Sequence, residues 1–353
     1  MTAVHVVVPD GIDDPAQPSG GNAYDRRVCR GLTALGWSVR EHPVPGSWPR
    51  PDAAARAGLA RAMAELPDGA VVLVDGLIAS TAPEVLVPES ARLRLVVLVH
   101  MPLGRDCVGA EVAGARERSV LSAAAAVVTT SAWTRSWLLD RYALRPAQVH
   151  VAEPGVEAAE LAPGTASGGE LLCVAAVIPG KGHDVLLEAL TEIVDLPWRC
   201  VCVGALTRDP GFVNRLGRQA RDGGISDRVL LAGPRTGADL DAAYAAADAL
   251  VLASRAETYA MVVTEALARG LPVVATNVGG LPQALGRGAD GSRPGLLVPP
   301  DDPAALAAAL RRWLGDTSTR RRFREVAHER RGVLPAWSST ALRVSQVLAE
   351  VAP

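Results

Sequence analysis

The sequence predicts an α/β protein with two doubly wound parallel sheets. Short valine-rich runs of roughly four to eight residues alternate with longer Ala-, Leu- and Arg-rich segments of helical period. The runs are apolar almost throughout, which is typical of parallel strands buried on both faces. The alternation stops once, near residues 154–169, and then restarts. In a chain of 353 residues, this repeated pattern indicates two domains.

The first half, residues 1–155, is expected to form an N-terminal Rossmann-like domain. Its expected strands are Val4–Pro9, Ser38–Pro43, Ala70–Asp75, Leu93–Val99, Ala126–Thr130 and Gln148–Ala152. The expected helices between them are Asn22–Leu35, Asp52–Leu66, Glu111–Ala124 and Ala132–Tyr142. Strands that alternate with helices in this way predict a parallel sheet.

The segment Pro154–Gly169 is rich in Gly, Pro and small residues and has no periodicity, so we interpret it as an interdomain linker. A second Rossmann-like domain is expected over residues 170–335. Its expected strands are Leu171–Val177, Arg199–Gly204, Arg228–Ala232, Ala249–Ala253, Pro272–Thr276 and Gly295–Val298. Its expected helices are Val185–Ile193, Phe212–Asp222, Leu240–Ala247, Met261–Arg269, Ala304–Leu314 and Thr319–Arg331.

A last helix, near Ser338–Val351 within residues 336–353, could cross back to the N-terminal domain. We expect the two domains to face one another across a cleft, with ligands at the carboxyl ends of the strands.

Charge and hydropathy exclude several classes of function. The net charge is −2 and the isoelectric point is near 6.3, so no overall field attracts nucleic acid or anionic lipid. The chain contains no run of about 18 apolar residues that could span a membrane, and Met1–Pro9 lacks the pattern of a signal peptide. The basic segment Arg311–Arg331 has few aromatic residues, which favours a solvated helix over membrane contact. We therefore expect a cytoplasmic protein.

The cysteines predict neither disulfides nor a metal site. There are five of them, an odd number, and none has C-x-x-C spacing: Cys29, Cys107, Cys173, Cys200 and Cys202. Cys200 and Cys202 lie two residues apart in an apolar run, so they should share one face of a strand and behave as small buried hydrophobes.

Lys181 is the only lysine in the chain and the first candidate site residue. It lies between Gly180 and Gly182, after an expected strand and before an expected helix. Glycines on both sides let backbone amides approach an anion, and the helix adds its positive N-terminal end. This arrangement suits a diphosphate, although the loop is not of Walker A type. The alternative is an ordinary turn with a solvated lysine.

Two glutamates, Glu257 and Glu265, form the second candidate. Glu257 precedes an expected helix that begins near Met261, and Glu265 lies inside that helix. Free amides at the helix N-terminus can bind phosphate or sugar oxygens, and a carboxylate one turn further can accept two hydrogen bonds from a ribose diol. Alternatively, Glu257 caps the helix and Glu265 lies on a solvated face.

Four motifs in order resemble those of retaining glycosyltransferases of family 4, which have the GT-B fold. Ser254–Gly280 resembles the E-x7-E segment of that family, and Val174–Leu187 resembles its lysine-containing turn. Ser19–Asn22 resembles its first glycine loop, and Val99–Pro102 its strand-end histidine. The resemblance implies a hexosyl transfer from a nucleotide-diphosphate sugar, with UDP as the first choice of nucleotide and GDP as the second. It also implies that the domain over residues 1–155 binds the acceptor and the domain over residues 170–335 binds the nucleotide-sugar donor.

The resemblance also implies the roles of individual residues. His100 would lie beside the reacting sugar, and Glu257 would bind the hydroxyls of that sugar. Glu265 would bind the ribose, Lys181 the diphosphate, and Gly20 and Gly21 would permit close approach to the phosphates. The complete set of implied donor-binding residues is Gly20, Gly21, Lys181, Thr258, Tyr259, Ala260, Met261, Val262 and Glu265.

Three residues depart from the family pattern. Ala176 replaces an arginine in the first turn, so one cationic diphosphate ligand is missing; Arg255 could substitute for it. Ala260 replaces a glycine, and Gln283 a common glutamate. The loss at Ala176 keeps a non-catalytic nucleotide-sugar-binding protein open as an alternative, beside a sugar-nucleotide epimerase of the same fold.

No D-x-D cluster follows an expected strand, so no divalent ion is expected to assist the leaving group. Nor does the resemblance leave an obvious carboxylate nucleophile. We therefore expect a metal-independent, front-face reaction with no bound cofactor, a donor nucleotide-sugar as co-substrate and an acceptor that the sequence does not identify.

Overall fold

The computed structural model describes residues 2–16, 18–105 and 110–352, so Cys107 lies outside the described residues. The chain divides into two compact units. One comprises Met1–Asp14, Ser19–Gly155 and Pro335–Pro353, and the other comprises Pro15–Pro18 and Val156–Leu334. We call them the N-terminal and the C-terminal domain.

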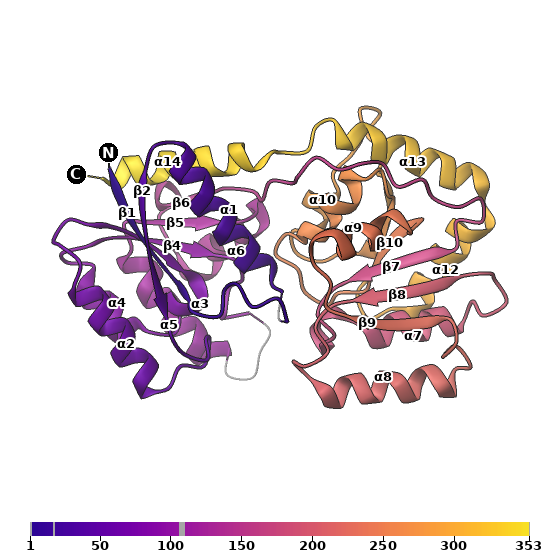
Figure 1. The fold of residues 1–353 in the computed structure, drawn as a ribbon, viewed down its shortest axis with the longest axis horizontal. Coiled ribbons are helices and arrows are strands. Elements are labelled where there is room, and N and C mark those ends of the chain that lie inside the picture. The colour runs from indigo at the N-terminus through magenta and orange to yellow at the C-terminus, as the bar shows by residue number, and fades with distance from the viewer. Residues whose placement is uncertain (1, 17, 106–109, 353) are drawn as a thin grey trace. The chain divides into compact units, whose positions relative to one another are not determined.

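The N-terminal domain is a six-stranded parallel sheet flanked by helices (Figure 1). The strands are β1 (Ala3–Pro9), β2 (Ser38–Val44), β3 (Val71–Asp75), β4 (Arg94–Val99), β5 (Ala126–Thr129) and β6 (Val149–Val151). Their order in the sheet is β2-β1-β3-β4-β5-β6. The helices are α1 (Gly20–Ala34), α2 (Ala53–Ala64), α3 (Gly76–Ala79), α4 (Pro83–Glu89), α5 (Ala110–Ala123), α6 (Ala132–Tyr142) and α14 (Trp337–Val351).

The C-terminal domain has a second six-stranded parallel sheet, in the order β12-β11-β10-β7-β8-β9. The strands are β7 (Glu170–Val174), β8 (Arg199–Val203), β9 (Val229–Gly233), β10 (Ala249–Leu252), β11 (Val273–Thr276) and β12 (Gly295–Val298). The helices are α7 (His183–Thr191), α8 (Pro210–Asp222), α9 (Gly237–Ala245), α10 (Met261–Ala268), α11 (Leu281–Leu285), α12 (Pro303–Gly315) and α13 (Thr317–Arg331). A 3-10 turn, Pro179–Lys181, precedes α7.

The apolar character of the strands explains why both sheets are buried between layers of helices. Every residue of β3, β10 and β11 is buried, as expected for strands covered by helices on two faces. The two expected doubly wound sheets are confirmed, and the order of the C-terminal sheet is the common Rossmann order. The expected cleft between the domains stays a prediction.

The structure corrects three local expectations. Gly20 and Gly21 form the first turn of α1 rather than a loop, because the chain turns helical directly after the extended Ser19. Residues 76–92, expected to contain no element, hold α3 and α4. Asp75 caps α3 by accepting a hydrogen bond from the backbone amide of Leu77, and α4 starts at Pro83. The short helix α11 was also not expected.

The last helix, α14, packs on α1 in the N-terminal domain (Figure 1). Val344, Val347 and Leu348 of α14 share a buried apolar cluster with Val28 and Leu32 of α1. Within the described ranges, no helix combines the length and the apolar character needed to cross a bilayer.

Candidate functional site

The order of the C-terminal sheet brings two loops together. In doubly wound sheets, ligands bind where the strand order reverses, beyond the carboxyl ends of the strands. Here that point lies between β7 and its neighbour β10. The loop after β7 contains Lys181, and the loop after β10 contains Glu257. The two candidate segments of the sequence therefore meet at the position where this fold binds ligands.

Glycine is required at one position of the turn before α7. Gly182 has φ +65°, and a Cβ atom there would lie 1.9 Å from the carbonyl oxygen of Ala253, which follows β10. Gly180 has no such neighbour. The backbone amide of Arg255 donates to the carbonyl of Gly180 across 2.9 Å, which connects the two loops.

Arg255 is held by carboxylates. Its guanidinium donates two parallel hydrogen bonds to the Asp184 carboxylate, each 2.9 Å long, and Nε donates to Asp301 across 2.6 Å. These bonds connect the loop after β10 to the first turn of α7. Arg255 therefore stabilises the shape of the lysine turn, and its charge is already balanced. This arrangement argues against Arg255 as the substitute for the arginine missing at Ala176.

Lys181 and Glu257 contact each other directly. Nζ of Lys181 donates to Oε1 of Glu257 across 2.7 Å, and the Ser254 hydroxyl donates to the same oxygen across 2.7 Å. The Lys181 side chain is 28% exposed and that of Glu257 10%. An ammonium partly open to solvent and held by a carboxylate can exchange part of that contact for an incoming anion.

The amides at the N-terminus of α10 lie next to this pair in the chain. Met261 and Val262 open the helix, so their N–H groups have no acceptor within it. Ala260, at the N-cap, has φ +69° and ψ +70°. Thr258 is half-buried, and Tyr259 is buried. Residue 260 therefore has a left-handed backbone conformation, which glycine adopts without strain.

Glu265 is paired with a residue that the sequence did not indicate. Its Oε2 accepts a hydrogen bond from the Tyr244 hydroxyl across 2.8 Å. Burial raises the pKa of Glu265, although the Tyr244 bond and the charge of Arg269 act in the opposite direction. Among the described residues, Oε1 has no hydrogen-bond partner. One oxygen is thus fixed while the other can bind a ligand.

The remaining predicted residues lie in the N-terminal domain, where the sheet order reverses between β1 and β3. His100 follows β4, and Gly21 lies against its ring: a Cβ atom at position 21 would be 3.2 Å from Cδ2 of His100. Gly20 precedes it at the start of α1. Tyr24 meets the His100 ring edge-on, at 5.2 Å between centroids. Gly21 therefore permits the close packing of α1 on the histidine.

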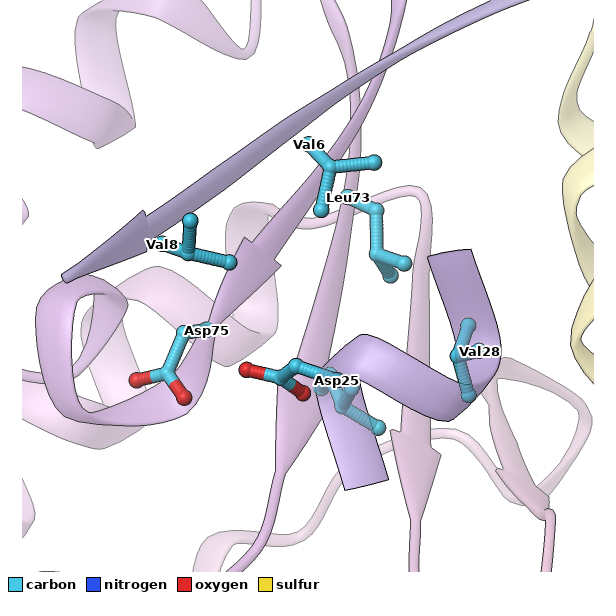
Figure 2. Close-up of a pocket in the computed structure, with 7 residues that line it drawn as sticks. Val6, Val8, Asp25, Val28, Leu73 and Asp75 are labelled. Atoms are coloured by element: carbon cyan, nitrogen blue, oxygen red, sulfur yellow. The ribbon is translucent and has the colours of Figure 1, made fainter. Parts of the chain in front are cut away.

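Two buried carboxylates surround the imidazole. Nε2 of His100 lies 2.8 Å from Oδ1 of Asp25 and 3.6 Å from Oδ2 of Asp75. The side chains of Asp25 and Asp75 are 3% and 4% exposed, and Figure 2 shows their carboxyl groups directed toward one another. The cavity they line has a volume of about 10 Å³, too small for a sugar.

The cluster shifts two pKa values. Burial and the charge of Asp25 raise the pKa of Asp75 to about 7, against the opposing effect of His100. Burial lowers the pKa of His100, but Asp25 and Asp75 raise it more, so the net shift is upward. At neutral pH the cluster holds protons that isolated groups would release.

Sequence reasoning missed Asp25, Asp75, Tyr244 and Asp184. One signal was available, because Asp75 ends a strand that is otherwise apolar and so lies at the carboxyl edge of the sheet. Asp25 and Tyr244 lie inside helices and carry no comparable signal.

Comparison with known proteins identifies the C-terminal domain. Residues 168–316 match the family described as glycosyl transferases group 1. A D-inositol 3-phosphate glycosyltransferase of Kineococcus radiotolerans is 35% identical over 248 residues, which are 64% of this chain and 57% of that relative. The chain therefore spans little more than half the length of that relative. The matched residues include Lys181, Glu257 and Glu265.

Solved structures match the fold over nearly the whole chain. Sucrose-phosphate synthase from Thermosynechococcus elongatus has a TM-score of 0.79 at 21% identity and covers 99% of both chains. HepE of Anabaena in complex with UDP-glucose has a TM-score of 0.78 at 18% identity and covers 99% of this chain and 100% of that one. At such identities the likeness concerns the fold, which is GT-B.

Proposed function

We propose that this chain is a retaining glycosyltransferase that transfers a hexose from a nucleotide-diphosphate sugar, with UDP as the first candidate nucleotide and GDP as the second. The contact between Lys181 and Glu257 carries the proposal. The resemblance assigns these two residues to adjacent parts of one donor, and they meet at the strand-order reversal. The group 1 domain supports a donor of this class.

In the proposed complex, Lys181 and the first amides of α10 bind the diphosphate, and Glu257 binds hydroxyls of the sugar. Glu265, held by Tyr244 through one oxygen, accepts hydrogen bonds from the ribose through the other. Thr258 to Val262 supply backbone contacts, and Gly20 and Gly21 permit close approach to the phosphates. His100 contacts the transferred hexose.

The proposed chemistry needs no metal and no carboxylate nucleophile. The acceptor oxygen forms a bond to the anomeric carbon on the face from which the diphosphate leaves, while the bond to the β-phosphate oxygen breaks. The acceptor proton passes to that departing phosphate oxygen. Lys181 and the helix N-terminus stabilise the developing negative charge. His100 adds hydrogen bonding to an oxocarbenium-like state, and the sugar keeps its anomeric configuration.

The acceptor and the location belong to the same proposal. Relatives named D-inositol 3-phosphate glycosyltransferase support an inositol phosphate as the first acceptor to test. We place the reaction in the cytoplasm, with no nucleic-acid partner and no membrane contact required.

A nucleotide-sugar-binding protein without activity is the second candidate, and one observation favours it. Ala176 removes one cation from the lysine turn, and Arg255 is already paired with Asp184 and Asp301. A single cation would suffice for binding yet stabilise a leaving diphosphate less well than two.

Incubation of the full chain with UDP- and GDP-hexoses, with and without inositol phosphate, distinguishes these functions. A transferase forms a glycosylated acceptor, an epimerase changes the sugar without acceptor, and a binding protein shows only a raised melting temperature with the nucleotide. The anomeric proton coupling constant of the product tests retention, and activity in EDTA tests metal independence. A β-linked product from an α-linked donor would contradict the retaining mechanism.

A further inference from the structure

A cluster of sulfur and nitrogen ligand atoms lies in the core of the C-terminal domain. Cys173 of β7, Cys202 of β8 and His183 of α7 each place one such atom within 4.8 Å of the other two. All three residues are at most 1% exposed. None of them is among the donor-binding residues proposed above.

Strand pairing assembles this cluster from residues far apart in the sequence. Cys173 and Cys202 are direct partners in the parallel register of β7 and β8. Cys200 lies two residues before Cys202 on the same face of β8, and the two Sγ atoms are 4.0 Å apart. His183 is the first residue of α7, which packs on the sheet. Three thiols and one imidazole thus gather at one side of the sheet.

The imidazole of His183 lacks a strong polar partner. Its Nε2 lies 3.7 Å from Sγ of Cys173, and among the described residues its Nδ1 has no hydrogen-bond partner. A thiol is only a weak donor and acceptor. Burying a polar ring with no stronger contact costs free energy that this contact does not offset. A coordinate bond to Nε2, the nitrogen that faces Cys173, would give the ring one strong contact.

We propose that Cys173, Cys202 and His183 bind one structural Zn²⁺ ion, contrary to the expectation from cysteine spacing. Cys200, whose Sγ lies 4.0 Å from that of Cys202 but outside the cluster of three, turns toward the ion as the fourth ligand. Zn–S bonds of about 2.3 Å and Zn–N bonds of about 2.0–2.1 Å place tetrahedral ligand atoms about 3.5–3.8 Å apart. The separations of 3.7 Å and 4.0 Å lie close to those values. Three thiolates and one neutral imidazole give the site one net negative charge, as in other zinc sites with three cysteines and one histidine, and the coordinate bonds offset the cost of burying it.

This zinc has a structural role and is separate from the reacting atoms. His183 follows Gly182 and Lys181 directly, so a metal bond to its ring fixes the start of α7 where the diphosphate is proposed to bind. A fully buried ion exchanges only when the domain opens, so brief treatment with EDTA leaves it in place. The inference stands on the cluster alone and is independent of the transferase assignment.

The test measures metal in the purified full chain. We expect about one equivalent of zinc by elemental analysis. Cys173→Ser, Cys202→Ser and His183→Ala should each lose most of it, and Cys200→Ser should bind zinc more weakly. Cys29→Ser is the matched control, because Cys29 is a buried free cysteine of the N-terminal domain; this variant should keep its zinc.

Cobalt reconstitution tests the site in the wild type, since the variants could fail to fold. The chain is unfolded with a chelator in denaturant and refolded with Co²⁺ alone. We expect one equivalent of cobalt with strong near-ultraviolet absorption from thiolate charge transfer, and a higher melting temperature than after refolding with chelator. Wild-type protein without zinc that refolds equally well with chelator and shows no cobalt–thiolate band would overturn the proposal. If Cys200→Ser binds as much zinc as the wild type, with the same affinity, then Cys200 is not a ligand of the ion.

Discussion

Oδ1 of Asp25 accepts a hydrogen bond from Nε2 of His100 across 2.8 Å, from inside helix α1 of the N-terminal domain. The carboxylate therefore keeps the proton on Nε2 and leaves Nδ1 as the nitrogen that can contact a substrate. It also stabilises a positive charge on the ring. In the proposed reaction Asp25 is thus a positioning residue for His100.

Asp25→Asn should lower kcat by roughly 10- to 100-fold, the scale seen when the partner that orients a functional histidine is lost. The donor KM should change little, because Asp25 does not touch the nucleotide in this proposal. Steady-state kinetics with the identified acceptor measure both values. Asp13→Asn is the control, since Asp13 pairs with Arg26 of the same helix at the surface. A kcat equal to that of the wild type would show that Asp25 does not orient His100.

The pH dependence of stability in the N-terminal domain follows from the raised pKa values of Asp75 and His100. Folded Asp75, with a pKa of about 7, keeps a proton that the unfolded chain releases near the ordinary aspartate pKa of 3.8. The free energy of unfolding should therefore fall as pH rises from about 4 to 7. The raised pKa of His100 acts in the same direction, because its contribution is present below 6.5 and is lost as pH rises through the folded pKa.

Native-state hydrogen exchange of β3 and β4 at pH 5 and pH 8 should show this loss of protection. Between pH 5 and pH 8, the free energy of unfolding of Asp75→Asn should change by on the order of 1–2 kcal/mol less than that of the wild type, because the amide does not titrate. Asp68→Asn, at an exposed position, serves as the control. Equal slopes in the wild type and Asp75→Asn would contradict the raised pKa.

Three substitutions separate the roles within the donor site. Lys181→Ala should weaken nucleoside diphosphate binding by about 2–3 kcal/mol, because it removes a charge-assisted contact. Glu265→Gln should weaken nucleotide and nucleotide-sugar equally. Glu257→Gln should weaken only the nucleotide-sugar, and free nucleotide should bind at least as well because Lys181 loses its competing partner.

Isothermal titration calorimetry with UDP and a UDP-hexose measures all three. Arg311→Ala is the control for general loss of positive charge, because Arg311 pairs with Asp195 at the surface. Equal losses for both ligands in Glu257→Gln would place Glu257 at the nucleotide instead of the sugar.

Gly182→Ala should destabilise the C-terminal domain by at least about 2–3 kcal/mol, because alanine is disfavoured at φ +65° and its Cβ would clash with the Ala253 carbonyl. Gly180→Ala, two residues earlier in open space, should change stability by less than about 0.5 kcal/mol. Urea denaturation followed by far-ultraviolet circular dichroism compares the pair. Similar midpoints for the two variants would refute the proposed steric requirement.

Ala260→Gly should stabilise the C-terminal domain by about 0.5–1 kcal/mol, since relief of left-handed strain exceeds the added entropy of the unfolded glycine. Ala256→Gly, in the same loop but without a positive φ, should instead be neutral or destabilising. Thermal unfolding of both variants decides the sign. A lower melting temperature for Ala260→Gly would mean that position 260 is not strained.

The sequence predicts the sheets well because their signal is local. The run Val71–Val74 is apolar at every position, and such a run is stable only when both of its faces are covered. Short helices carry too few residues for a period, so α3 and α11 escaped prediction. Their starts depend on a capping carboxylate and a proline.

Contacts within the candidate sites depend on sheet order, which no local pattern encodes. Asp25 and His100 are 75 residues apart, and Lys181 and Glu257 are 76 apart. The motifs identified Lys181, Glu257, Glu265 and His100 through resemblance. Their buried partners Asp25, Asp75 and Tyr244 became visible only when helices and strands were placed side by side. The register of β7 and β8 likewise decides that Cys173 lies opposite Cys202.

The packing of α14 on α1 has a consequence for synthesis on the ribosome. The N-terminal domain contains residues from both ends of the sequence, so the apolar cluster around Val28 and Leu32 of α1 stays incomplete until Val344 and Val347 emerge. At about 5–20 residues per second, the segment between Leu32 and Val344 takes roughly 15–60 s to translate. During that interval the nascent domain exposes apolar surface on α1 that α14 covers in the folded chain. Chaperone binding should therefore concentrate on chains arrested before residue 337 and decline once α14 has left the exit tunnel.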